Sequence, residues 1–111
     1  MVELRVVSPA EVHQFAGQGS VLLDVRDERE WALGRAPGAT HIPLAELPDR
    51  VDELSGASTI VCVCRSGGRS RRAAIFLLDH GVDAVNLDGG MIAWVESGGP
   101  LESDGGEPTI L

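Results

Sequence analysis

The feature that most constrains the fold is a tight turn between an apolar strand pattern and an apolar helical pattern. Residues 59–63 (TIVCV) are β-branched and apolar, which is typical of a strand buried on both faces. Residues 73–79 (AAIFLLD) form a helical run that ends before Gly81. Residues 64–70 (CRSGGRS) lie between them and are too few and too rich in glycine for anything but a tight turn. This order predicts a strand-turn-helix unit of an α/β sheet.

Cys64 begins this turn, at the carboxyl end of the predicted strand, where α/β sheets place their functional sites. Backbone N–H groups of a glycine-containing turn can converge on an anion, and the following helix adds the positive end of its dipole. Gly67 and Gly68 allow a positive φ and a close backbone approach. The same stretch carries four arginines: Arg65, Arg69, Arg71 and Arg72. All of these favour a thiolate, so we expect a lowered pKa and a nucleophilic Cys64.

The same residues allow two other interpretations. The first is an inert buried cysteine beside a solvated arginine cluster. The second is a cysteine phosphatase or arsenate reductase, whose cradle has the spacing C-x5-R and fits a tetrahedral oxyanion. Here Arg69 lies five positions after Cys64, and Ser70 occupies the position that the phosphatase arginine would need. The shorter cradle fits the terminal sulfur of a persulfide better than a phosphate.

At these residues the sequence resembles the rhodanese family of sulfurtransferases. Residues 23–26 (LDVR), 30–31 (EW), 34–39 (GRAPGA) and 41–43 (HIP) are similar to the family's N-terminal signature, and residues 87–94 (LDGGMIAW) to its C-terminal one. With the turn, these motifs extend from about Val21 to Pro100. The sequence departs from the usual family residues at Arg35, Ala36 and Met91.

The resemblance implies a three-layer α/β domain with a mainly parallel five-stranded sheet flanked by helices. It also implies a Cys64 persulfide intermediate that needs neither a metal nor an organic cofactor. The expected anion cradle and its charge come from Arg65, Ser66, Gly67, Gly68, Arg69 and Ser70. Within it, Arg65 and Arg69 are expected to attract an anionic sulfur donor.

The function that this implies is transfer of a sulfane sulfur from thiosulfate or a persulfide donor to cyanide, a thiol or a protein acceptor. An alternative is a sulfur carrier that depends on a protein partner and turns over small donors poorly. The residues do not decide between these two functions, and they leave the oligomeric state open.

The remaining periodicities predict strands alternating with helices, which favours a mainly parallel sheet. The expected strands are 4–7, 21–25, 40–42, 59–63 and 84–87. The expected helices are 9–16, 28–33, 44–54, 69–80 and 89–95, with a capping box at Ser8 and a break or kink near Pro48.

Four polar residues have expected supporting or structural roles. Asp24 lies near the end of a buried strand, where it should accept hydrogen bonds from backbone or an arginine and hold the loop, or cap the next segment. Arg26 is a candidate partner of Glu30. His41 is expected to be structural, because a cradled thiolate needs no base. Cys62 points to the same face as Cys64 but lies too far from it for an ordinary disulfide, so we expect it to pack in the core.

Composition and charge also indicate which partners, location and domain bounds to expect. The net charge of −8 argues against binding to nucleic acid or to an anionic membrane, while four of the nine basic residues fall within 65–72. No apolar run approaches the length of a membrane span, and the start lacks the pattern of a secretory leader, so we expect a cytoplasmic protein. We expect one domain over residues 1–101 and a flexible tail over residues 102–111, where Gly, Pro, Ser and acidic residues predominate.

Overall fold

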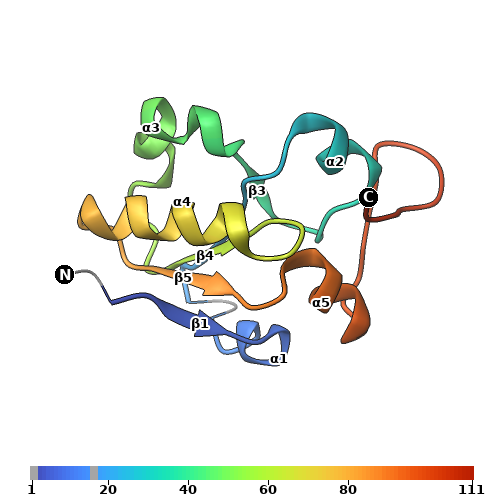
Figure 1. The fold of residues 1–111 in the computed structure, drawn as a ribbon, viewed down its shortest axis with the longest axis horizontal. Helices are drawn as coiled ribbons and strands as arrows, with labels where there is room; N and C mark the ends of the chain where they lie inside the picture. The colour runs from blue at the N-terminus through green and yellow to red at the C-terminus, as the bar shows by residue number, and fades with distance from the viewer. Residues whose placement is uncertain (1–2, 16–17) are drawn as a thin grey trace.

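The chain folds around a parallel sheet of five short strands (Figure 1). The computed structural model describes residues 3–15 and 18–111. The strands are β1 (Arg5–Val7), β2 (Val21–Asp24), β3 (Thr40–His41), β4 (Ile60–Val63) and β5 (Ala84–Leu87). Their order is β1-β5-β4-β2-β3, and each neighbouring pair is parallel. The predicted five-stranded α/β fold is therefore confirmed, with β4 at the centre of the sheet.

The helices follow the predicted order with one clear difference. They are α1 (Pro9–Val12), α2 (Glu28–Leu33), α3 (Leu47–Arg50), α4 (Gly68–Asp79) and α5 (Gly90–Glu96), with 3₁₀ turns at Leu44–Glu46 and Val51–Leu54. The single helix predicted over 44–54 is thus three short pieces. Proline has no N–H, so a helix begun at Leu44 cannot continue through Pro48. Pro48 lies instead in the first turn of a new helix, α3.

The capping box predicted at the start of α1 is present. The Ser8 hydroxyl accepts a hydrogen bond from the Glu11 N–H, and the Glu11 carboxylate accepts one from the Ser8 N–H. This helix ends at Val12, before the predicted end at Ala16, which lies outside the described residues.

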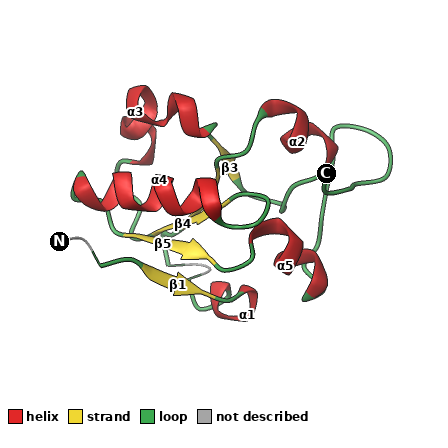
Figure 2. Ribbon diagram, in the orientation of Figure 1, coloured by secondary structure: helices red, strands yellow, loops and turns green. Residues whose placement is uncertain are grey.

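Helices cover both faces of the sheet and so create two cores. Figure 2 shows α3 and α4 on one side of the sheet and α1 and α5 on the other. Along β4, Ile60 and Cys62 pack in the core beneath α4, whereas Val61 and Val63 pack in the core beneath α5. Burial of both faces explains why the sequence of β4 is apolar throughout rather than alternating.

A buried ion pair closes the end of β2. Arg26 donates to the Asp24 carboxylate from Nε at 3.0 Å and from Nη2 at 2.7 Å, and both side chains are fully buried. Arg26 also donates to the backbone oxygens of Glu30 and Gly34, at 3.4 and 2.7 Å. Asp24 therefore accepts the expected hydrogen bonds. The expected ion pair of Arg26 with Glu30 is wrong, because the carboxylate partner of Arg26 is Asp24.

The C-terminal segment, residues 102–111, makes backbone hydrogen bonds to α2 and to the residues after it, and its flexibility stays a prediction. Figure 1 shows it returning past α2. Its backbone hydrogen bonds, at 2.9 to 3.0 Å, join Arg35 with Glu102 in both directions, Asp104 to Ala32 and Thr109 to Leu33. Gly34 leaves room for this contact, since a Cβ there would lie 3.0 Å from the Thr109 nitrogen. The segment is held by backbone groups, which a polar composition does not reveal.

We predict that Asp24→Asn strongly destabilises the fold. The substitution removes one charge of a fully buried pair and leaves Arg26 uncompensated, which costs about 3 to 5 kcal/mol in comparable sites. The measurement is the free energy of unfolding from urea titration. The control is Glu53→Gln on the exposed Arg50–Glu53 pair, which should leave the urea midpoint almost unchanged. Equal effects of the two substitutions would contradict a structural role for the buried pair.

Candidate active site

The Cys64 loop connects the central strand β4 directly to the first turn of α4. Gly67 has φ of +118°, a left-handed conformation that turns the chain into the helix and favours glycine. Gly68 differs from expectation: it has no positive φ, and a Cβ added there would meet no atom within 4 Å. Only the first glycine of the pair is required by the backbone.

The loop converges on the sulfur of Cys64. The Sγ atom accepts hydrogen bonds from the Gly67 N–H at 3.1 Å and from the Ser70 hydroxyl at 3.3 Å. Burial acts to raise the pKa of Cys64, but hydrogen bonds from the Ser70 hydroxyl and from the N–H groups of Ser70, Gly67 and Ser66 outweigh it. The pKa of Cys64 is therefore lower than that of an ordinary thiol, and the site favours an anionic sulfur.

The start of α5 orients this loop. The Met91 N–H donates to the Cys64 carbonyl at 2.8 Å, and the Ile92 N–H donates to the Arg65 carbonyl at 3.1 Å. Gly90 permits the approach, because a Cβ there would lie only 2.6 Å from the Arg65 oxygen. With these carbonyls bonded to α5, the following N–H groups are free to point at the sulfur. The sequence analysis did not assign α5 to the site, although Gly89-Gly90 belongs to the C-terminal signature.

Asn86 on β5 is a second site residue that the sequence analysis missed. Its Nδ2 donates to the Gly67 carbonyl at 3.1 Å, which fixes the amide orientation because a carbonyl only accepts. Its Oδ1 then faces the Ser70 hydroxyl at 2.6 Å. A hydroxyl has one proton, so Asn86 Oδ1, the Gly67 carbonyl and the Cys64 sulfur compete for it. A lone asparagine in a strand gives no sequence signal of this contact.

Arg69 is paired within the protein. Its Nη1 and Nη2 donate to the two carboxylate oxygens of Glu30 at 2.7 and 2.9 Å, a bidentate arrangement. The hydrogen bonds from Arg69 lower the pKa of Glu30 to about 2, so the pair is ionised near neutral pH. The role of Arg69 in attracting the donor stays a prediction, and Glu30 occupies the Nη1 and Nη2 donors of its guanidinium.

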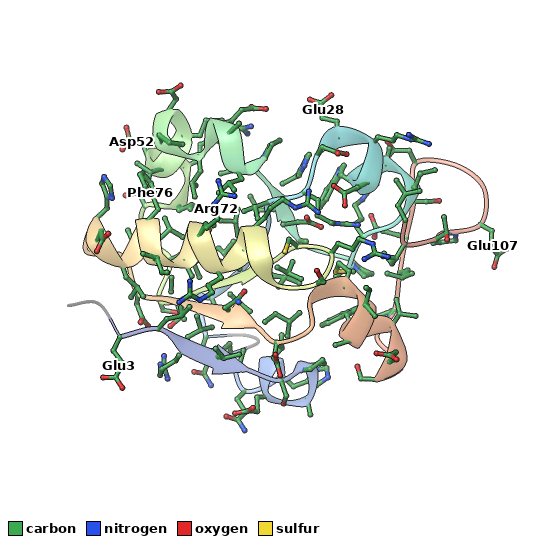
Figure 3. The ribbon with its side chains drawn as sticks, in the orientation of Figure 1. Glu3, Glu28, Asp52, Arg72, Phe76 and Glu107 are labelled. Atoms are coloured by element: carbon green, nitrogen blue, oxygen red, sulfur yellow. The ribbon has the colours of Figure 1, made fainter. Side chains whose placement is uncertain are left out.

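The other arginines of the stretch separate in space. Arg65 is exposed on the loop, and its Nε donates to the backbone oxygen of Leu111. Arg71 and Arg72 are exposed on α4, and Figure 3 shows Arg72 on the side of that helix toward α3. These arginines are close in the sequence, but their side chains point in different directions because they lie on a loop and on successive positions of a helix.

Asp24 and Arg26 reach the loop only through other residues. Arg26 holds the backbone of α2 at Glu30, and Glu30 holds Arg69 at the start of α4. His41 lies in the same region, where its Nε2 bonds to the Arg26 carbonyl at 2.8 Å and its ring stacks on Trp31 at 4.6 Å. These contacts give His41 the structural environment that was expected.

Cys62 is a core residue. It is fully buried, and desolvation raises the pKa of its thiol to about 12. Cys62 and Cys64 are both free thiols. The two cysteines therefore differ sharply in chemistry although they share one face of the sheet.

Within residues 3–15 and 18–111, no three His, Cys, Asp or Glu side chains converge to hold a metal ion. Over the same ranges, no helix has the length and apolar character needed to cross a bilayer.

Fold and loop together define an α/β domain with a cysteine-centred anion cradle. Residues 8–97 match the rhodanese-like domain family. The chain is 35% identical over 95 residues to YtwF of Bacillus subtilis, covering 84% of this chain and 92% of that protein. It is 39% identical over 82 residues to a protein named sulfurtransferase from Allochromatium vinosum, covering 73% and 77%. A crystal structure of a rhodanese-related protein from Thermoplasma volcanium superposes with a TM-score of 0.81 at 28% identity, covering 88% of this chain and 97% of that one. The chain therefore belongs to the rhodanese-like domain family.

We predict that alkylation of Cys64 follows a pKa lower than that of an ordinary free thiol. Because the folded protein favours the thiolate, the iodoacetamide rate should rise at lower pH than for a free thiol and then level off. Mass spectrometry of the digested protein assigns the label, and Cys62 should stay unmodified over the same range. A midpoint at or above that of a free thiol would contradict the cradle.

We predict that Asn86→Asp raises this midpoint by on the order of one pH unit. The carboxylate still accepts from Ser70, but it brings a negative charge close to the sulfur and disfavours the thiolate. Gln14→Glu is the matched control, because it adds the same charge at an exposed position after α1. Equal pH dependence of alkylation for Asn86→Asp and wild type would contradict an effect of Asn86 on the Cys64 thiolate.

Proposed function

We propose that the protein is a sulfurtransferase that carries a sulfane sulfur as a persulfide on Cys64. The observation that carries the proposal is the set of hydrogen bonds that Cys64 Sγ accepts from the Gly67 N–H and the Ser70 hydroxyl. These donors stabilise a thiolate before the reaction and a terminal persulfide anion after it. Membership of the rhodanese-like domain family and similarity to a protein named sulfurtransferase support this chemistry.

In the first half-reaction, the Cys64 thiolate attacks the outer sulfur of thiosulfate or of a persulfide donor. A new bond forms between Sγ and that sulfur, the sulfur–sulfur bond of the donor breaks, and sulfite or a thiolate leaves with the bonding electron pair. Arg65 is exposed on the loop and is the arginine best placed to attract an anionic donor. Arg69 is proposed as a positioning residue, since Glu30 holds it beside the loop.

In the second half-reaction, a nucleophilic acceptor attacks the outer sulfur of the Cys64 persulfide. The Cys64 thiolate leaves, and the acceptor becomes thiocyanate if it is cyanide or a persulfide if it is a thiol. Two separate transfers through one covalent intermediate give ping-pong kinetics. Each step exchanges one bond to sulfur for another, so the proposal involves no cofactor.

A second candidate function is a sulfur carrier that works with a protein partner. The pairing of Arg69 with Glu30 favours it, because this pair reduces the positive charge available to a small anionic donor. Such a carrier would take up sulfur from a cysteine desulfurase and would turn over thiosulfate slowly.

We predict that incubation with thiosulfate, without reductant, adds one sulfur atom to the intact protein and that cyanide removes it as thiocyanate. Cys64→Ser should lose the adduct and reduce turnover by about three orders of magnitude or more, because it removes the nucleophile. Intact-protein mass spectrometry and a colorimetric thiocyanate assay provide the two readouts.

Cys62→Ser is the matched control, since Cys62 is also buried and lies two positions earlier in the chain. It should keep the adduct and most of the turnover. Turnover by Cys64→Ser near the wild-type level would overturn the assignment. An adduct from a desulfurase but none from thiosulfate would favour the carrier.

A further inference from the structure

Two uncharged polar side chains, Ser70 on α4 and Asn86 on β5, are buried against each other beside the reactive sulfur. The other buried polar side chains of the described residues are held in ion pairs, and they are Asp24, Arg26 and Glu30. A buried polar group lowers stability unless it is hydrogen-bonded. An asparagine within the otherwise apolar strand β5 therefore needs an explanation in what it contacts.

Strand pairing places Asn86 beneath the first turn of α4. Asn86 is level with Cys62 on the neighbouring strand β4, so the two side chains share the face of the sheet that α4 covers (Figure 1). Ser70 lies in the first turn of that helix, and its hydroxyl is 2.6 Å from Asn86 Oδ1. Asn86 Nδ2 donates to the Gly67 carbonyl at 3.1 Å, which leaves Oδ1 as the acceptor for Ser70.

The Ser70 hydroxyl is the donor in the cradle that can turn. The N–H groups of Ser66, Gly67 and Ser70 have directions set by the backbone, whereas a hydroxyl proton rotates about its C–O bond. Its acceptors are Asn86 Oδ1 at 2.6 Å, Cys64 Sγ at 3.3 Å and the Gly67 carbonyl at 3.3 Å. The last distance exceeds the usual limit of about 3.0 Å between oxygens, so the main competition is between Oδ1 and Sγ.

The charge on Sγ decides which of these two acceptors receives the proton. A thiolate is an ionised acceptor, and hydrogen bonds to ionised groups are about twice as strong as neutral ones. In a persulfide, Sγ is bonded to a second sulfur and is uncharged, which makes it a weak acceptor. Arg69 also acts on Cys64 through its charge, but Glu30 holds its Nη1 and Nη2 donors in place. The hydroxyl should therefore face Sγ in the thiolate and Oδ1 in the persulfide.

We propose that Asn86 is a positioning residue that balances the two half-reactions, because it accepts the Ser70 hydrogen bond while Cys64 carries the sulfur. The inference rests on the proposed function. When Ser70 turns to the thiolate, the buried Oδ1 gives up this hydrogen bond, which raises the free energy of the thiolate relative to the persulfide. Asn86 thereby favours loading and restrains discharge. The proton stays on the Ser70 oxygen throughout, and the bonds exchanged at sulfur are those of the proposed function.

The test is Asn86→Leu, which removes the competing acceptor and keeps a side chain that branches at the same carbon. The hydroxyl then donates to the thiolate without leaving Oδ1 unpaired, so the iodoacetamide midpoint of Cys64 should move to lower pH. A thiolate of lower pKa is a weaker nucleophile and a better leaving group. At a pH above the midpoints, kcat/KM for thiosulfate should fall at least about two-fold, and kcat/KM for cyanide should rise at least about two-fold. Under ping-pong kinetics these constants report the first and second half-reactions separately.

The matched control is the same substitution in a protein that lacks the hydroxyl. In a Ser70→Ala background, Asn86→Leu should change neither the midpoint nor the ratio of the two kcat/KM values, because no hydroxyl proton is left to share. An effect transmitted through the Gly67 carbonyl would persist in that background, so the double-mutant cycle separates the two contacts of Asn86. Urea titration checks that each variant folds, and Asn86→Ala replaces Asn86→Leu if the larger side chain prevents folding.

Opposite changes in the two constants support the inference, since a distorted site would slow both half-reactions. Changes of the same sign, or equal effects of Asn86→Leu with and without the Ser70 hydroxyl, would overturn it. Wild-type protein that takes no sulfur from thiosulfate would count against the proposed function instead. The alkylation midpoints then still decide the inference: a shift that depends on Ser70 supports the shared proton, and an unchanged midpoint overturns it.

Discussion

The hydrogen bonds from the start of α5 to the Cys64 loop are the contacts on which the rest of the site depends. A short turn has as many carbonyl groups as N–H groups, and an anion cradle needs only the N–H groups to point inward. Met91 and Ile92 donate to the carbonyls of Cys64 and Arg65 and so satisfy them on the outer side of the turn. Because these carbonyls are bonded to α5, the N–H of Gly67 can donate to the sulfur. The lowered pKa of Cys64 follows from the Ser70 hydroxyl and from the N–H groups that this arrangement directs at the sulfur.

A chain of buried charges fixes the other side of the site. Asp24 and Arg26 are fully buried at the end of β2, where each compensates the other. Arg26 uses its remaining donors on the backbone of α2 and the turn after it. The helix thereby presents Glu30 to Arg69, and the Arg69 pairing restrains the first turn of α4. These ion pairs therefore hold the elements around Cys64 in place, whereas Arg65 lies on the exposed part of the loop.

The C-terminal segment shows how a common fold can acquire a specific surface. The family match ends at residue 97, yet residues 102–111 bond to α2, and residues 108–111 line a cavity beside Arg65. The sheet and the turn after β4 hold Cys64, while this segment adds a surface beside Arg65 of the same turn. Segments outside the regular elements of a fold vary more readily than the elements themselves.

Local patterns in the sequence were sufficient for the strands, most helices, the capping box at Ser8 and the placement of Cys64 at the end of β4. These features depend on residues close together in the chain, and their periodicity and turn residues can be recognised in the sequence. The contacts of Asn86, Gly90 and Glu30 with the loop depended on the tertiary structure, because parallel strands and helices bring together residues far apart in the chain. The same reason explains why Glu30 pairs with Arg69 rather than with Arg26, and why the segment 102–111 packs on α2, since both depend on long-range hydrogen bonds. The sequence by itself determined which cysteine begins the turn after β4, and only the tertiary structure decided which groups surround its sulfur.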